Sequence, residues 1–243
     1  MCRMIAFASA EPRDVAPCLA EMARLATCGN LVDGWERRPG GNHPDGWGIA
    51  FRQGDETHVV RSGKPANSDP LLGTVRAAAD RFIGHIRYAS NVATVNASNA
   101  HPFQAGGIVL AHNGTFYGAI GEEAGRRNVS DTLVFLERLA RAWSERTFPA
   151  LREVLSGMLS DPALVGDYSA ANLLILADGA LYALRNFRRD PDYYTLSLRA
   201  APGEAVVASE PPEGEPGFRL LGNGELVELR PSAPRSAQVA FAP

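Results

Sequence analysis

The sequence has few cysteines and no arrangement that pairs them. It contains three, and none belongs to a Cys-x-x-Cys motif. An odd, unpaired set argues against a disulfide framework, so a reducing cytoplasm is the expected setting. The N-terminus also lacks the organisation of a signal peptide, because the apolar segment 4–10 is short and Glu11 follows it. We therefore expect a cytoplasmic protein.

Long apolar runs, excess positive charge and zinc-type ligand spacing are missing too. No run approaches the length of a bilayer span. The 24 Lys and Arg residues are balanced by 27 Asp and Glu, and the net charge of −3 offers no footprint for nucleic acid or an anionic membrane. The five histidines show neither the i, i+4 pairing nor the cysteine spacing of a zinc site. We expect no metal, cofactor, nucleic acid or membrane partner.

No Gly/Ser-rich or Pro-rich linker divides the 243 residues, so we expect a single domain over residues 2–243. Hydrophobic periodicity predicts strands at both ends of the chain and helices between them. The predicted strands are 2–9, 46–52, 57–61, 82–89, 108–112, 171–177, 181–187, 193–198 and 205–209, with a final hairpin at 222–224. The predicted helices are 14–26, 71–79, 130–143 and 149–159, and 90–106 is a long loop of the kind that is usually functional or disordered. This order indicates an α+β fold with more than one sheet layer.

Cys2 combines two groups that catalysis can use. Its small side chain permits removal of Met1, which leaves a thiol and a free α-amine on one residue. The reference pKa of an α-amine is about 7.7–8.0, so the amine can take the thiol proton near neutral pH. This is the nucleophile-plus-base arrangement of an N-terminal residue. The alternative is a small apolar strand residue.

Asn113-Gly114 follows an apolar strand and has two interpretations. Asn-Gly between apolar segments is a strong signal for a hairpin turn. The same dipeptide can aim a side-chain amide and a backbone N–H at one point, which makes an oxyanion hole.

Three further positions could bind a substrate. Arg87 at a strand end can hold a carboxylate bidentately, and Asp131 at a helix start either caps the helix or pairs with an ammonium. Together they would recognise an α-amino-acid head group. The glycine in Gly46-Trp47 indicates close backbone approach, or else an ordinary turn followed by a core tryptophan.

These features occur in one order along the chain: an N-terminal Cys, DGWG (45–48), GHIRYAS (84–90), NAHPF (99–103), HNG (112–114) and SDT (130–132). The set resembles the glutaminase domain of class II glutamine amidotransferases, in the N-terminal-nucleophile hydrolase superfamily. The motifs cover residues 2–135, and residues 165–243 would be a β-rich completion of the fold. AVVASEPP (205–212) is similar to a stretch of the small stand-alone members.

The resemblance implies a four-layer α/β/β/α sandwich and a role for each motif residue. Cys2 would be nucleophile and base, and Asn113 with Gly114 would form the oxyanion hole. The substrate-binding residues implied are Arg87 for the α-carboxylate, Asp131 for the α-ammonium, Tyr88 and Ser90 at the pocket border, and Gly46 and Trp47 in the DGWG motif. The family often reads RWATH where this chain has RYASN (87–91), which leaves the leaving-group preference open.

Three functions are compatible with this resemblance. The first is hydrolysis of a small γ-glutamyl amide through a Cys2 thioester. The second is a glutaminase subunit that delivers ammonia to a separate synthase partner, because the chain ends after one glutaminase-sized domain. The third is a non-catalytic γ-glutamyl binder, which retention of Met1 would favour. A homo-oligomer is compatible with each of them.

Overall fold

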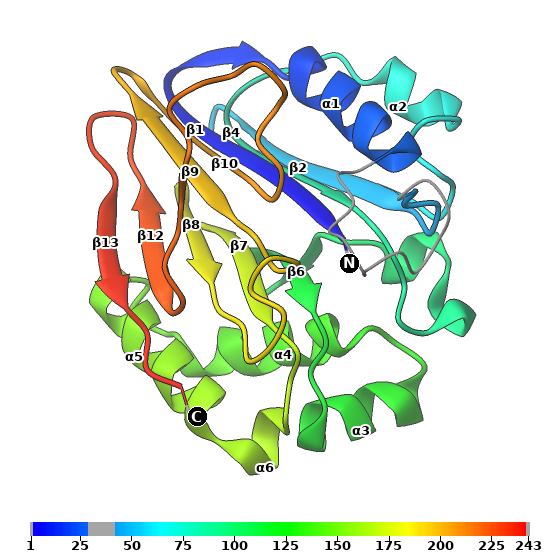
Figure 1. Cartoon of the computed structure of the whole chain (residues 1–243), viewed down its shortest axis with the longest axis vertical. Coiled ribbons are helices and arrows are strands. Elements are labelled where there is room, and N and C mark those ends of the chain that lie inside the picture. Colours follow the sequence, from blue (N-terminus) through cyan, green and yellow to red (C-terminus); the bar gives the residue numbers. More distant parts are fainter. Residues whose placement is uncertain (1, 29–41, 242–243) are drawn as a thin grey trace.

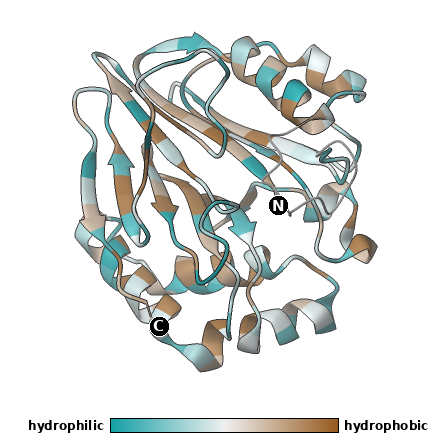
Figure 2. Cartoon of the chain, viewed as in Figure 1, coloured by the Kyte–Doolittle hydropathy of each residue, from teal (hydrophilic) through white to brown (hydrophobic). Residues whose placement is uncertain are grey.

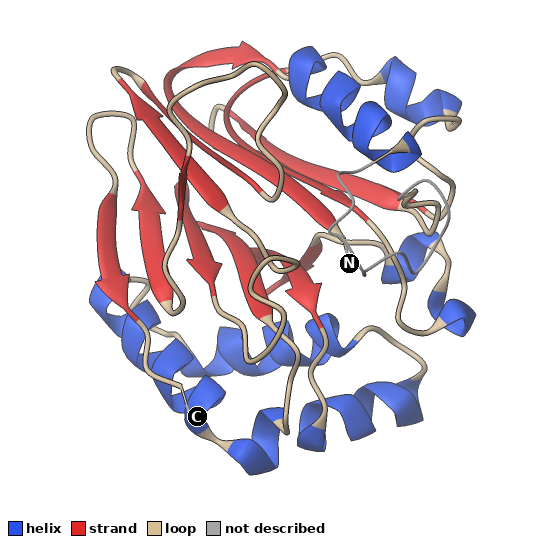
Figure 3. Ribbon diagram, viewed as in Figure 1, coloured by secondary structure: helices blue, strands red, loops and turns tan. Residues whose placement is uncertain are grey.

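Two antiparallel sheets lie face to face in the computed structural model of the chain, which describes residues 2–28 and 42–241. Helices cover the outer side of each sheet (Figures 1 and 3). The expected α+β architecture, a four-layer α/β/β/α sandwich, is therefore confirmed. Among the described residues no helix is both long and apolar enough to cross a membrane.

The first sheet has seven strands in the order β11-β9-β10-β1-β4-β2-β3. Their bounds are β1 Arg3–Asp14, β2 Trp47–Gln53, β3 Glu56–Ser62, β4 Ala78–Ile86, β9 Ser197–Ala201, β10 Glu204–Ala208 and β11 Arg219–Leu220. The second sheet has six strands in the order β13-β12-β8-β7-β6-β5. Their bounds are β5 Phe103–Ala105, β6 Ile108–Gly114, β7 Ala171–Ala177, β8 Ala180–Arg185, β12 Glu225–Leu229 and β13 Arg235–Gln238.

The helices fall into two groups, one for each sheet (Figure 1). The first sheet carries α1 Ala16–Thr27 and α2 Pro70–Thr74. The second carries α3 Gly118–Arg127, α4 Asp131–Ala142, α5 Phe148–Ser160 and α6 Pro162–Val165. Two short 3-10 turns, η2 Val92–Thr94 and η3 Ala97–Asn99, precede β5.

Strand alternation decides which side chains enter which layer. In β1, Met4 and Ala6 point toward the second sheet, whereas Ile5 and Phe7 pack beneath α1. Figure 2 shows hydrophobic residues on the strands of both sheets and on the helices, with hydrophilic residues interspersed on both. The same alternation places Cys2, two residues before Met4, on the face of β1 that meets the second sheet.

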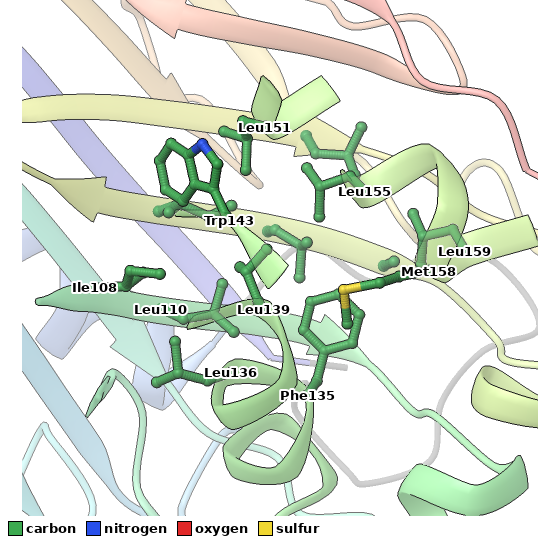
Figure 4. Packing of buried hydrophobic residues seen from close by; sticks show 14 of the residues in the cluster. Ile108, Leu110, Phe135, Leu136, Leu139, Trp143, Leu151, Leu155, Met158 and Leu159 are labelled. Atoms are coloured by element: carbon green, nitrogen blue, oxygen red, sulfur yellow. The ribbon is translucent and has the colours of Figure 1, made fainter. Parts of the chain in front are cut away.

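The other large core lies between the second sheet and its helices. Side chains of α4 and α5 pack on the second sheet there, among them Phe135, Leu139, Leu151 and Leu155. Leu110 of β6 and Trp143, just after α4, belong to the same cluster (Figure 4). Each such side chain contributes about 1.5–3 kcal/mol when fully buried. Ser130 begins α4 as predicted, because its side chain accepts a hydrogen bond from the Thr132 amide. This packing fixes the first turn of α4 beside the end of β6.

The helix predicted at 71–79 is wrong. Only α2 is helical there, and β4 already begins at Ala78. The reason is that β4 pairs with β1 on one side and β2 on the other, and this pairing outweighs local helix propensity. The loop at 90–106 was also incomplete as a prediction, since it contains η2, η3 and β5.

The structure rules out the hairpin interpretation of Asn113-Gly114, and the hairpin predicted at 222–224 is wrong as well. Asn113-Gly114 is not a hairpin turn, because β6 continues through both residues and pairs them with Asn172 and Ala171 of β7. Gly222 to Gly224 is not a hairpin either. The strands on its two sides belong to different sheets, since β11 pairs with β9 and β12 with β8 and β13.

Candidate active site

Cys2 lies between the two sheets, next to the end of β6 (Figure 1). Its backbone nitrogen donates to Oδ1 of Asn113 over 3.2 Å. Its Sγ atom lies 3.4 Å from the backbone nitrogen of Tyr88 and 3.6 Å from the Tyr88 carbonyl oxygen. Burial raises the pKa of the thiol, and the nearby guanidinium groups of Arg87 and Arg3 oppose that rise. The thiol is therefore protonated near neutral pH unless a base takes its proton.

Asn113 presents an amide group beside the thiol. Alternation along β6 sends its side chain toward the first sheet, whereas Leu110 and His112 face the helices. Oδ1 is used by Cys2, but Nδ2 is buried and has no hydrogen-bond partner in the described part of the chain. A buried, unpartnered donor costs about 1–3 kcal/mol. The site thus holds an amide donor without an acceptor.

Gly114 has a backbone that only glycine fits. Its φ is +149°, and a Cβ atom there would lie 1.9 Å from the carbonyl oxygen of Ala170. The residue ends β6, so its peptide is held by the ladder with β7. The Asn113-Gly114 pair is consequently a rigid feature of the sheet.

Arg87 follows the last residue of β4 and is 5% exposed. Its backbone nitrogen donates to the Gly46 carbonyl over 2.8 Å. Its guanidinium donates to the carbonyl and the Oγ1 of Thr94, over 2.6 and 2.7 Å. Burial lowers the pKa of this arginine, and the charges of Cys2, Asp45 and Asp131 raise it. An arginine stays protonated in proteins, so a fixed cation stands at this position.

Asp131 is the first residue of α4. Its Oδ2 accepts from the Phe116 amide over 2.6 Å, and its Oδ1 accepts from the Thr132 amide over 3.0 Å. A carboxylate in the first helical turn is also stabilised by the helix dipole. The side chain is therefore held in one orientation.

One cavity brings the two charges together. It measures about 450 Å³ and is lined by Arg87 and Asp131. Ser90 and Asn91 border it from the loop after β4, and Tyr117 borders it from the start of α3. A cation and an anion on opposite elements of one cavity complement a zwitterionic amino-acid head group.

The structure places three of the expected substrate-binding residues in different settings: Gly46, Trp47 and Tyr88. Gly46 has φ +111° and approaches the backbone of Ser62, so its role is in the backbone. The Trp47 side chain is fully buried among the residues under α1 and α2, and its indole nitrogen donates to Asp69 over 3.1 Å. The structure does not bring that side chain to the cavity. Tyr88 reaches Cys2 through its backbone.

Four residues beside the site were not predicted. Asp45 accepts from the Ala89 amide over 2.8 Å and so fixes the turn after Arg87. Thr94 holds the Arg87 guanidinium, and Thr132 lies behind Asp131. Asn172 is fully buried opposite Asn113. A signal was available for Asn172, because it is the polar residue of the otherwise apolar strand ANLLILA.

Over residues 2–28 and 42–241, no group of three or more His, Cys, Asp or Glu side chains is arranged to hold a metal ion.

Curated relatives cover different shares of the chain. An uncharacterised protein of Methanocaldococcus jannaschii is 26% identical over 186 residues, 70% of this chain and 50% of that protein. A putative glutamine amidotransferase of Haemophilus influenzae is 31% identical over 133 residues, 51% of this chain and 42% of that protein. The chain thus spans about half the length of these two relatives. The γ-glutamyl-hercynylcysteine sulfoxide hydrolase of Mycolicibacterium smegmatis is 28% identical over 240 residues, 95% of this chain and 96% of that protein.

Solved structures share the fold. Glutamine phosphoribosylpyrophosphate amidotransferase from B. subtilis aligns with a TM-score of 0.63 at 19% identity, over 98% of this chain and 49% of that one. A glutamine aminotransferase class-II domain protein from Silicibacter pomeroyi aligns with a TM-score of 0.61 at 19% identity, over 98% of this chain and 100% of that one. The model of the family "Glutamine amidotransferases class-II" matches residues 1–211. That match covers most of the chain, and on this ground the chain belongs to the class II glutamine amidotransferase family.

Proposed function

We propose that the protein hydrolyses a γ-glutamyl amide through a glutamyl thioester on Cys2, after Met1 has been removed. The family match and the similarity to a γ-glutamyl-hercynylcysteine sulfoxide hydrolase support amide hydrolysis in general. The observation that carries the mechanism is the contact of the Cys2 nitrogen with Asn113 Oδ1, over 3.2 Å, beside an unpartnered Asn113 amide.

The first chemical step needs a base, because burial raises the pKa of the Cys2 thiol. The α-amine of Cys2, with a reference pKa of about 7.7–8.0, takes this proton directly or through one water. Asn113 Oδ1 orients the amine by accepting one of its hydrogens. The sulfur then attacks the γ-carbonyl carbon of the substrate.

Charge develops next on the γ-carbonyl oxygen. Asn113 Nδ2 and the Gly114 N–H donate to it, and each such donor contributes about 3 kcal/mol to transition-state stabilisation. The protonated α-amine returns its proton to the leaving amine or ammonia, and the C–N bond breaks. Water then attacks the thioester, and glutamate leaves with the thiol restored.

A glutamyl preference would follow from the two charges that line the cavity, Arg87 and Asp131. Arg87 binds the α-carboxylate with guanidinium hydrogens that Thr94 does not use, and Asp131 binds the α-ammonium. Ser90 and Tyr88 border the substrate.

We further propose that residues 2–243 form one domain, since Met4 near the N-terminus shares a core with Val227 and Leu229 of β12. We also propose that this domain is cytoplasmic.

A second function has an observation in its favour. The chain spans 50% and 42% of two curated relatives and 49% of the B. subtilis amidotransferase, so those proteins carry further segments. In this second function the protein would act as a glutaminase subunit, and a synthase partner would receive the ammonia. Such a subunit should show little glutaminase activity alone and more when its partner is added, whereas a stand-alone hydrolase is fully active by itself.

Affinity labelling tests the proposed nucleophile. A glutamine-like electrophile, 6-diazo-5-oxo-norleucine, should add once, to Cys2, and free glutamine should protect against it. Peptide mapping locates the adduct. Cys2→Ala should take up none, whereas Cys18→Ala and Cys28→Ala should label as the wild type does. Labelling at Cys18 or Cys28 would refute the assignment.

Arg87→Ala should raise KM on the order of 100-fold with a smaller change in kcat. The reason is that charge-assisted hydrogen bonds of about 1.5–3 kcal/mol each bind the α-carboxylate in ground and transition states alike. Steady-state kinetics with glutamine and with 4-aminobutyramide, which lacks the α-carboxylate, measures this. The wild type should discriminate between the two amides and the variant should not. Arg76→Ala, at an exposed arginine that contacts only backbone carbonyls, is the matched control. Preserved discrimination in Arg87→Ala would contradict the role.

A further inference from the structure

A buried hydroxyl lies between two imidazole rings behind the site. Thr132 follows Asp131 in α4 and is 1% exposed. Its Oγ1 lies 2.8 Å from Nε2 of His101 and 3.0 Å from Nδ1 of His112. A hydroxyl has one hydrogen, so it can donate to only one of these rings and must accept from the other. The donor and acceptor roles along His101, Thr132 and His112 therefore run in one direction or the other.

The partner of the second His112 nitrogen decides that direction. Nε2 of His112 lies 3.0 Å from the Ala170 carbonyl oxygen, which only accepts, so Nε2 carries the hydrogen. Burial lowers the pKa of His112, which keeps the ring neutral and leaves a lone pair on Nδ1. Thr132 consequently donates to His112 and accepts from Nε2–H of His101. The series of hydrogen bonds runs from His101 through Thr132 and His112 to the Ala170 carbonyl.

This series of hydrogen bonds ends on the backbone around Asn113 and Gly114. The Ala170 carbonyl is the group that a Cβ atom on Gly114 would strike. A third imidazole acts from the other side, since His85 of β4 donates to the His112 carbonyl over 3.1 Å, in the peptide that leads into Asn113. Imidazoles thus hold both the peptide that precedes Asn113 and the Ala170 carbonyl that faces Gly114. A displacement of about 1 Å in a catalytic group can cost on the order of 10²-fold in rate.

We propose that Thr132 is a positioning residue. Acting through His112, its hydroxyl sets the placement of the Asn113 and Gly114 donors and ties them to Asp131, the adjacent residue in the head-group cavity. This inference rests on the proposed function and deepens it. Thr132 touches no reacting atom, so its effect should appear in turnover and not in substrate binding.

Two substitutions separate the hydroxyl from the shape of the side chain. Thr132→Val keeps the branched shape and removes the hydroxyl, and it should lower kcat on the order of 10–100-fold with KM changed less than about threefold. Thr132→Ser restores the hydroxyl and should return kcat to within a few-fold of wild type. Thr147→Val is the matched control: it removes a threonine hydroxyl that caps α5 away from the site, and should lower Tm without changing kcat.

The results that would overturn the role are specific. An unchanged kcat in Thr132→Val, equal losses in the valine and serine variants, or a loss confined to KM would each do so while leaving the proposed function intact. A wild type that neither turns over γ-glutamyl amides nor labels at Cys2 would overturn the proposed function, and the positioning role with it.

Histidine tautomers give a readout that needs no substrate. Long-range ¹H–¹⁵N NMR at neutral pH should find His85, His101 and His112 neutral with the hydrogen on Nε2. In Thr132→Val the His112 Nδ1 resonance should shift, because its donor is gone, and in Thr132→Ser it should return. A wild-type His112 with its hydrogen on Nδ1 would reverse the series of hydrogen bonds and refute the proposal.

Discussion

Replacing Cys2 with alanine is expected to abolish hydrolysis of γ-glutamyl amides, with a fall in kcat on the order of 10⁴-fold or more. The backbone nitrogen of Cys2 contacts Asn113, and no thioester can form at this residue without its thiol. The fold should survive, because the substitution removes a single sulfur atom just before β1 begins. Steady-state turnover of a γ-glutamyl anilide measures the loss, and the thermal melt checks the fold.

The other two cysteines provide matched controls for this result. Cys18 lies on the buried face of α1 and its pKa is raised to about 12 by burial, so it is unreactive. Cys28 is exposed at the end of the same helix. Cys18→Ala and Cys28→Ala should retain wild-type kcat. Full activity in Cys2→Ala would refute covalent catalysis at this residue, whatever the controls show.

Asn113→Asp should lower kcat on the order of 10²–10³-fold, the cost of losing one oxyanion donor. Aspartate keeps an oxygen that can accept from the Cys2 nitrogen, but it has no Nδ2 hydrogens and its negative charge opposes the developing oxyanion. Asn113→Ala removes both functions and should be at least as slow. KM should change little in either variant, because the donors act on charge that appears in the transition state.

A distant asparagine controls for the loss of buried amide contacts. Asn223 exchanges two hydrogen bonds with the backbone of Phe187, far along the chain from the site. Asn223→Ala should cost stability and leave kcat unchanged. An Asn113→Asp enzyme that loses affinity and keeps its kcat would contradict the oxyanion role.

The sequence predicted correctly those elements whose hydrophobic pattern matches the faces that they bury in the fold. The apolar strand at 171–177 and the helix capped by Ser130 are of this kind. Helix α3 was missed because Gly118, Gly121 and Gly125 lower its intrinsic helix propensity, and packing on α4 and α6 compensates. The helix predicted at 71–79 failed for the opposite reason, since strand pairing outweighed its local preference.

The motif residues of the site could be singled out from the sequence because they occur together in a known order, but their supports could not. Asn113 was read as hairpin or oxyanion donor, and only its pairing with Asn172 rules out the hairpin. Thr132 contacts His101 and His112, 31 and 20 positions away in the chain. No local period reports such contacts, so the sequence contained no signal for them.

The central claim is that a processed N-terminal Cys2 carries the glutamyl group during turnover. Mixing the enzyme with a γ-glutamyl anilide, quenching in acid within one turnover and mapping the peptides by mass spectrometry tests this claim directly. We expect an N-terminal peptide that begins at Cys2, carries one glutamyl unit and releases it with hydroxylamine. Turnover by an enzyme that retains Met1, or a glutamyl group on any other residue, would contradict it.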